Sequence, residues 1–173
     1  ETGEVEDGKR VSVFTRKAGY HYGWDWGPRL VTSGIWRPVT LCSWDDIRIK
    51  DFNISYSFDG PTFIKTDVLI ESSVDNKNAT LLISLNDSTV VSSDLNLIKG
   101  EQNLIHNFTL KNPRLWWPNG MGKQNLYDFK AEIKSNDQTR FSEQKLGFKE
   151  IYLEEKDSTQ SPNFFFNVNG YPI

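Results

Sequence analysis

Two tryptophans surround one carboxylate in the segment Trp24-Asp25-Trp26, and a glycine stands on either side of these three residues. An indole face can cover the C–H side of a pyranose ring, while a carboxylate accepts hydrogen bonds from two adjacent hydroxyls. Glycines favour irregular backbone, and loops often carry binding residues. The segment therefore predicts a sugar-binding loop, although two core aromatics beside a turn-capping aspartate would give the same pattern.

The composition fits a small globular protein and excludes several classes of partner. The 173 residues carry a net charge of −3, and 37% of them are hydrophobic. Acidic and basic residues are interspersed, so we expect neither nucleic acid nor a membrane surface as a partner. No apolar run approaches the roughly 18 residues of a membrane span. The polar start, residues 1–4, does not resemble a signal peptide.

No residue pattern predicts a metal or a cofactor. Pairs of His, Cys or acidic residues with metal-ligand spacing are absent from the sequence, as is a glycine-rich phosphate loop. His21 belongs to the aromatic segment, and His106 fits a structural position in a strand. Cys42 is the single cysteine, and its apolar neighbours predict a small buried residue.

Period-two alternation in short runs dominates the rest of the chain, and helical periodicity is hardly visible. The expected strands cover residues 52–58, 64–74, 80–85, 89–97, 104–110, 127–133 and 139–153. About seven short strands separated by turn clusters are typical of an immunoglobulin-like antiparallel β-sandwich. We therefore predict an all-β fold, with only a few strands in residues 10–41.

Four N-x-S/T triplets begin at Asn53, Asn78, Asn86 and Asn107. They would accept N-linked glycans in a protein secreted by a eukaryote. They could equally be accidents of a bacterial sequence rich in Asn and Ser. The second interpretation fits better here, because several of the triplets lie within apparent strands.

Several longer motifs carry a family resemblance. They comprise residues 16–29 and 34–39, then Leu115-Trp116-Trp117-Pro118-Asn119-Gly120 with 124–127, then 146–151, and finally 166–173. In this order they resemble landmarks of the β-mannosidases of glycoside hydrolase family 2. The first motif is specific to the mannosidases, whereas the later ones resemble the wider family.

The resemblance implies three regions. Residues 1–46 would be the C-terminal part of a sugar-binding jelly-roll domain, residues 47–153 the immunoglobulin-like sandwich, and residues 154–173 a linker into a (β/α)8 catalytic barrel. The sequence contains no Asn-Glu pair of the kind that carries the family's acid/base glutamate. Retaining glycosidases need two carboxyl groups about 5–5.5 Å apart. We therefore expect a non-catalytic portion of a retaining exo-β-mannosidase, with no catalytic residue of its own.

The resemblance also assigns roles to the aromatic loop. Trp24 would wall the pocket for a terminal β-mannosyl unit, and Asp25 would accept hydrogen bonds from its non-reacting hydroxyls. Arg29 would orient that carboxylate through a charge-assisted pair. Trp26 either contacts the sugar or is structural, since neighbours in extended backbone point opposite ways. The expected partners are β-mannoside saccharides and the catalytic barrel, and no cofactor is implied.

Alternatives from other classes stay open. A free-standing carbohydrate-binding module could use the same loop, and an immunoglobulin-like interaction domain could use none of it. Leu115-Trp116-Trp117-Pro118-Asn119-Gly120 could form a second sugar platform, but a structural bridge between two strands fits its turn residues better. A bacterial periplasmic or secreted location is expected, with the lysosome as the eukaryotic alternative.

Overall fold

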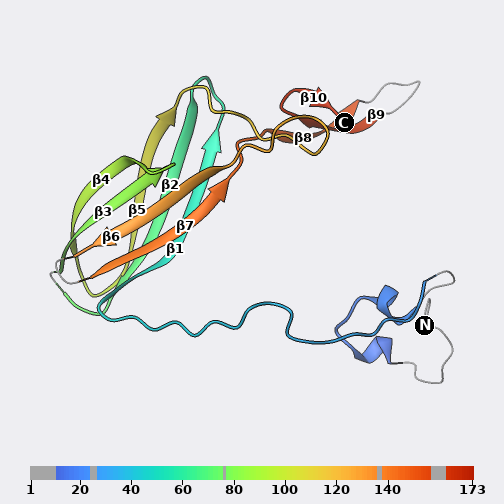
Figure 1. Ribbon diagram of the computed structural model, residues 1–173, viewed down its shortest axis with the longest axis horizontal. Coiled ribbons are helices and arrows are strands. Elements are labelled where there is room, and N and C mark those ends of the chain that lie inside the picture. The colour runs from blue at the N-terminus through green and yellow to red at the C-terminus, as the bar shows by residue number, and fades with distance from the viewer. Residues whose placement is uncertain (1–10, 24–26, 76, 136–137, 157–162) are drawn as a thin grey trace. The chain divides into compact units, whose positions relative to one another are not determined.

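The structure is a computed structural model that describes residues 11–23, 27–75, 77–135, 138–156 and 163–173 (Figure 1). The chain divides into two units, residues 1–42 and residues 43–173.

The described part of the first unit contains two short 3-10 helices, η1 (Ser12–Phe14) and η2 (Gly19–Tyr22). Tyr22 is buried, with 1% of its surface exposed. The few strands expected within residues 10–41 do not occur among the described residues 11–23 and 27–41. Extended backbone becomes a strand only where a neighbour supplies ladder hydrogen bonds. Cys42 is exposed, so the prediction of a buried thiol was wrong.

The second unit contains an antiparallel sandwich of two sheets (Figure 1). One sheet has the order β1-β2-β5, with β1 (Ile47–Ser57), β2 (Thr62–Ser72) and β5 (Gly100–Leu110). The other has the order β4-β3-β6-β7, with β3 (Lys77–Leu85), β4 (Ser88–Leu97), β6 (Tyr127–Lys134) and β7 (Thr139–Leu146). These strands confirm the prediction of an all-β antiparallel sandwich.

Alternate residues of each strand point inward and form one core between the two sheets. Phe148, just after β7, belongs to this core and has no exposed surface. Its ring meets the rings of Tyr56 and Tyr127 edge to face, each at 5.0 Å between centroids. Aromatic pairs of this kind contribute about 0.5–1.5 kcal/mol each beyond the area that they bury.

The last strand expected from the sequence, residues 139–153, is broken in the structure. β7 ends at Leu146, and β8 (Ile151–Lys156) belongs to a separate small sheet with β9 (Asn163–Val168) and β10 (Tyr171–Pro172). Between β7 and β8 the backbone groups form hydrogen bonds with side chains and with a loop, and not with a neighbouring strand. The Phe148 carbonyl accepts from the Trp116 N–H at 2.8 Å, and the Lys149 N–H donates to the Tyr56 hydroxyl at 3.1 Å.

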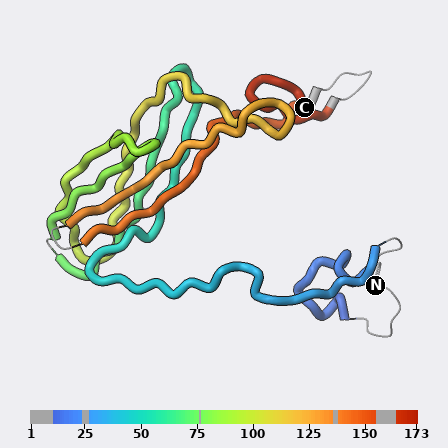
Figure 2. Tube along the Cα trace, viewed as in Figure 1, coloured from blue at the N-terminus to red at the C-terminus, as the bar shows by residue number. Residues whose placement is uncertain are grey.

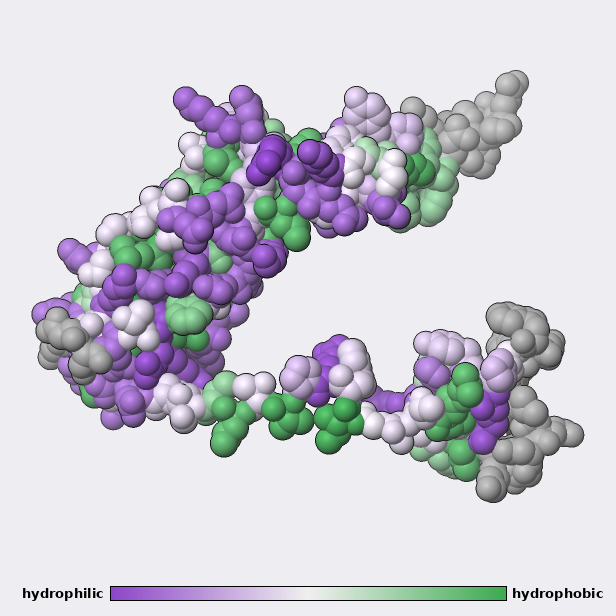
Figure 3. Space-filling model, viewed as in Figure 1, coloured by the Kyte–Doolittle hydropathy of each residue, from purple (hydrophilic) through white to green (hydrophobic). Residues whose placement is uncertain are grey.

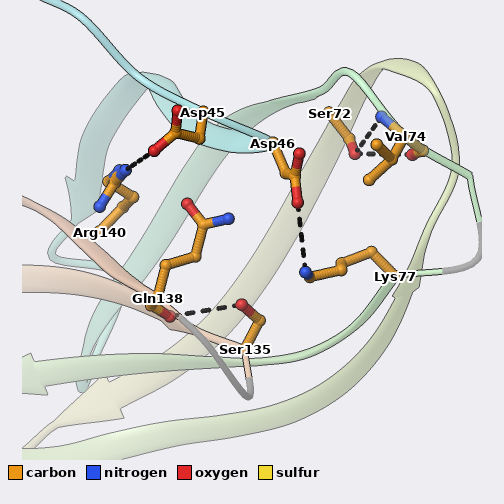
Figure 4. A network of polar contacts seen from close by, with 8 residues as sticks. All are labelled: Asp45, Asp46, Ser72, Val74, Lys77, Ser135, Gln138 and Arg140. Carbon is orange, nitrogen blue, oxygen red and sulfur yellow. Dashed lines mark hydrogen bonds and ion pairs between the residues drawn. The ribbon is translucent and has the colours of Figure 1, made fainter.

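Polar contacts fix the segment that leads into β1 (Figure 4). The Asp46 carboxylate lies 3.3 Å from Lys77 Nζ at the start of β3, and its carbonyl accepts from the Ser73 N–H at 2.8 Å. The neighbouring Asp45 lies 3.9 Å from Arg140 on β7. Because Lys77 and Arg140 belong to the sheet opposite β1, these contacts join the two sheets at one end of the sandwich.

Candidate functional site

The aromatic loop of the first unit begins with η2 and continues through Gly23. That glycine has φ +108°, a backbone conformation that side chains with a Cβ rarely adopt. The Leu30 N–H donates to the His21 carbonyl at 3.1 Å, so the backbone doubles back on itself across the loop. Trp24, Asp25 and Trp26 lie outside the described residues, and their roles stay predictions.

Arg29 is the one predicted site residue whose surroundings are described. Its guanidinium carbon lies 5.7 Å from the centre of the Tyr22 ring, and the arginine side chain is half-buried. A guanidinium over an aromatic face is attracted by the ring quadrupole and loses freedom to reorient. Tyr22 therefore supports Arg29, a role that sequence reasoning missed although Tyr22 stands within the same motif.

The second aromatic segment, residues 115–120, connects β5 to β6 and has structural contacts. Trp116 packs against Gly147, where an added Cβ would meet the indole at 2.8 Å. Lys149 Nζ lies 4.3 Å from the centre of the Trp116 ring. Both backbone polar groups of Trp116 are hydrogen-bonded. Its N–H donates to the Phe148 carbonyl, and its carbonyl accepts from Asn169 Nδ2 at 3.0 Å. These contacts favour the structural interpretation of this segment.

The neighbouring indole connects the sandwich to the small sheet. Trp117 meets the ring of Tyr171 edge to face. Asn169 also accepts the Glu150 N–H on its side-chain oxygen at 2.9 Å. Figure 2 shows the yellow-to-gold segment between β5 and β6 running up to the red region of β8–β10. Sequence reasoning did not single out Asn169 or Tyr171 beyond their motif.

A charged hollow of about 580 Å³ lies over the outer face of the β4-β3-β6-β7 sheet. Glu132 at its floor lies 2.6 Å from Lys134 Nζ and 3.1 Å from Lys130 Nζ. The hydrogen bond from Lys134 holds the pKa of the Glu132 carboxyl below its usual value, and Lys130 acts in the same direction. Asp128 in the same hollow pairs with Lys145 at 2.8 Å. The carboxylates named here are thus engaged in ion pairs.

Within the described ranges, no group of three or more His, Cys, Asp or Glu side chains is placed to hold a metal ion. No helix in the described part of the chain is long and apolar enough to cross a membrane.

Comparison with known proteins decides the family. The model described as "Glycosyl hydrolases family 2" matches residues 47–149, and "Glycosyl hydrolase 2 galactose-binding domain-like" matches residues 2–37. The chain belongs to glycosyl hydrolase family 2. The first of these matches covers the sandwich from the start of β1 to just past β7, and the second covers most of the first unit.

Curated proteins that are similar to this chain include β-mannosidases. Beta-mannosidase B of Aspergillus oryzae is 32% identical over 175 residues, which cover 96% of this chain and 20% of the relative. Beta-mannosidase B of Aspergillus flavus is 32% identical over 173 residues, with the same coverage. The resemblance predicted from the sequence motifs is confirmed. This chain spans about a fifth of the length of these relatives.

Solved structures are also similar to this chain. The β-D-mannosidase from Dictyoglomus thermophilum is 31% identical, with a TM-score of 0.70 over 91% of this chain and 20% of that one. The exo-chitosanase CsxA of Amycolatopsis orientalis, 16% identical with a TM-score of 0.62 over 74% of this chain and 15% of that one, shares the fold.

Proposed function

We propose that this chain is a non-catalytic portion of a retaining exo-β-mannosidase, which removes terminal β-D-mannosyl residues from saccharides. In this proposal it contributes a substrate-binding loop and supports a catalytic barrel. One observation carries the proposal: similarity to β-mannosidases extends over 96% of the chain, through both the aromatic loop and the sandwich. The jelly-roll portion would be residues 1–46, the sandwich 47–153 and the connector to the barrel 154–173.

The small sheet β8–β10 supports a docking role for the connector. Its register places one set of side chains on the same face. These side chains are Ile151, Leu153, Phe164, Phe166, Val168 and Tyr171. All are apolar, and all but Val168 are exposed, Phe164 by 69% of its surface. Hydrophobic residues gather at this end of the second unit in Figure 3. An apolar face of this kind is typical of an interface, and the barrel is the occupant that we propose.

The substrate-binding role rests on the aromatic loop. Trp24 walls the pocket in this proposal, and Asp25 accepts hydrogen bonds from hydroxyls away from the reacting centre. Arg29, supported by Tyr22, orients that carboxylate, while Trp26 contacts sugar or packs behind the loop. Contacts to non-reacting hydroxyls provide binding energy that can be directed to the transition state. Removing them should therefore lower turnover as well as binding.

A chimeric enzyme tests the proposal. Residues 11–173 replace the matching segment of the Dictyoglomus thermophilum β-D-mannosidase, and hydrolysis of a chromogenic β-mannoside is measured. An active chimera is expected. Asp25→Ala should then lower kcat/KM by about 100-fold, on the order of 3 kcal/mol for a charged acceptor lost from a closed site, with little change in Tm.

Asp45→Ala is the matched control, because Asp45 is an exposed carboxylate with a single long ion pair. It should leave kcat/KM unchanged. If Asp25→Ala keeps normal kinetics and instead lowers Tm by several degrees, Asp25 is a turn cap and the binding role is wrong. The isolated 173-residue chain should hydrolyse no β-mannoside, and turnover lost on mutating one of its own glutamates would contradict the non-catalytic assignment.

The compartment stays a prediction. The relatives and solved structures named above come from both fungi and bacteria, so a periplasmic or secreted bacterial protein and a lysosomal eukaryotic one remain the two proposed locations.

A further inference from the structure

The asparagines of all four N-x-S/T triplets are exposed in the structure. In three of the triplets, those beginning at Asn53, Asn78 and Asn107, the asparagine lies within a strand. The middle residues of these three, Ile54, Ala79 and Phe108, face the core. Residues i and i+2 of a strand share a face, so each asparagine and its Ser or Thr point outward together. Location within a strand therefore does not argue against modification.

Two of the asparagines have local structural roles that explain their presence. Asn86 has φ +46° in the turn between β3 and β4, and its side-chain oxygen accepts from the Asp128 N–H at 2.9 Å. Asn53 Nδ2 donates to the Asp51 carboxylate at 2.6 Å. The side chain of Asn107 has no hydrogen-bond partner among the described residues.

Exposed apolar side chains surround Asn107 on the outer face of the β1-β2-β5 sheet. Ile105, two residues earlier on β5, is 51% exposed, and Phe63 on β2 is 46% exposed. The register pairs Asn107 with Lys65 and Thr109 with Phe63, so Phe63 is diagonal to Asn107 and within reach of a group attached there. A hollow of about 290 Å³ lined by Phe63, Lys65 and Asn107, among others, opens on this face.

Phe63 and Ile105 interrupt a face that is otherwise largely polar. The side chains that share it include Asn53, Ser55, Ser57, Lys65, Asp67, Asn103 and Thr109. An aromatic ring and a branched aliphatic chain offer the apolar surface on which the C–H face of a hexose packs. Of the two triplet asparagines on this face, Asn53 and Asn107, only Asn107 has no side-chain hydrogen bond among the described residues, and Phe63 and Ile105 stand beside it.

We propose that Asn107 is an N-glycosylation site whose first sugar packs over Phe63 and Ile105. A secretory transferase would form the bond between Asn107 Nδ2 and C1 of the first sugar. The sugar–phosphate bond of a polyprenyl-diphosphate-linked oligosaccharide breaks, the polyprenyl diphosphate leaves, and a base takes the amide proton. The Thr109 hydroxyl completes the recognition triplet. This proposal is independent of the mannosidase proposal above.

Translation of the chain behind a secretory signal peptide, with endoplasmic-reticulum microsomes present, tests the modification. Asn107→Gln and Thr109→Ala should each remove one glycan-sized increment of mass, which a peptide-N-glycosidase also removes from the unaltered chain. Thr109→Ser should keep that increment. Asn103→Gln is the control, because Asn103 shares the strand and the face but begins no triplet. Equal numbers of glycans on the unaltered chain and on Thr109→Ala would overturn the proposal.

Thermal unfolding of the chain secreted from yeast tests the packing. The occupied protein should have a Tm about 2–4 °C above that of Thr109→Ala, since a covered apolar surface stabilises the folded state. In a Phe63→Thr background that difference should fall below about 1 °C, and Ile105→Thr should reduce it in part. Threonine keeps the strand preference at both positions. The same difference in all backgrounds would show that the sugar does not pack on these side chains.

Discussion

The ring of Trp117 meets the ring of Tyr171 edge to face, with 5.5 Å between the two centroids. Trp117 belongs to the connection between β5 and β6, whereas Tyr171 opens β10. Beside this pair, Asn169 bonds to the carbonyl of Trp116. The small sheet is therefore fixed to one end of the sandwich by an aromatic contact and a hydrogen bond. We expect substitutions at this junction to affect β8–β10 more than the sandwich core.

Trp117→Ala should weaken the attachment of the small sheet by about 1–2 kcal/mol, because it removes an aromatic pair and part of the surface that covers Tyr171. Hydrogen exchange should become faster in residues 151–156 and 163–172 and stay unchanged in β2 and β3. Met121→Ala in the same loop is the control, with little expected change. Uniformly faster exchange across the sandwich would contradict a local role for Trp117.

Asn169→Ala should destabilise the protein by about 1–3 kcal/mol, measured by urea unfolding. It removes two side-chain hydrogen bonds and places alanine at φ +53°. Asn169→Gly also loses the two hydrogen bonds but avoids the backbone strain. Its free energy of unfolding should therefore lie between those of Asn169→Ala and the unaltered protein. Asn112→Gly is the comparison, since Asn112 has φ +48° and is exposed. If both glycine variants were neutral, the Asn169 bonds would contribute nothing.

Gly147→Ala should destabilise by about 1–3 kcal/mol, the usual cost of overpacking. Its Cβ would lie 2.8 Å from the Trp116 side chain, which is itself held by backbone hydrogen bonds and cannot easily move away. Gly34→Ala, where nothing lies within 4 Å of the added Cβ, should leave Tm unchanged. Equal melting temperatures for the two variants would show that the Trp116 side chain moves aside with no loss of stability.

Lys134→Ala should lower stability at about pH 6 and have little effect at about pH 3. Lys134 and Lys130 hold the pKa of Glu132 below the ordinary value of 4.5. A depressed carboxyl pKa contributes stability above that ordinary value, and the contribution is lost as the pH falls through the folded-state pKa. The expected effect is below about 1 kcal/mol, as for surface ion pairs.

Urea unfolding at the two pH values measures the effect of Lys134→Ala. Lys111→Ala is the control, because Lys111 is exposed and has no ion pair among the described residues. The same loss of stability at both pH values would show that Lys134 acts through packing instead of charge.

The sandwich could be predicted because its strands are amphipathic. In β1, Phe52 is buried while Asn53 and Ser55 are exposed, as the period-two alternation predicts. The end of β7 could not be predicted in this way, since residues 139–153 continue the strand pattern. Trp116, distant in sequence, packs on Gly147 and bonds to Phe148. A contact between segments that are distant in sequence does not change the local alternation of apolar and polar residues, so it cannot be predicted from that alternation.

For the candidate site too, the sequence predicted some features and only the tertiary structure gave others. The motif that resembles the β-mannosidases predicted that Arg29 belongs with the aromatic loop, and the structure adds that its guanidinium lies over the Tyr22 ring. Strand periodicity explains why the asparagines of the three triplets within strands are exposed, whereas the place of Phe63 beside Asn107 depends on the pairing of β2 with β5.

The sequence by itself determined that the chain is all-β, that its motifs resemble those of the β-mannosidases of family 2, and which residues carry that resemblance. Each of these follows from local alternation or from short motifs. Only the tertiary structure decided that Tyr171 meets Trp117, that β7 stops before Gly147, and that Cys42 is exposed. Such features depend on which distant segments pack together, because burial and pairing are set by the whole fold and not by neighbours along the chain.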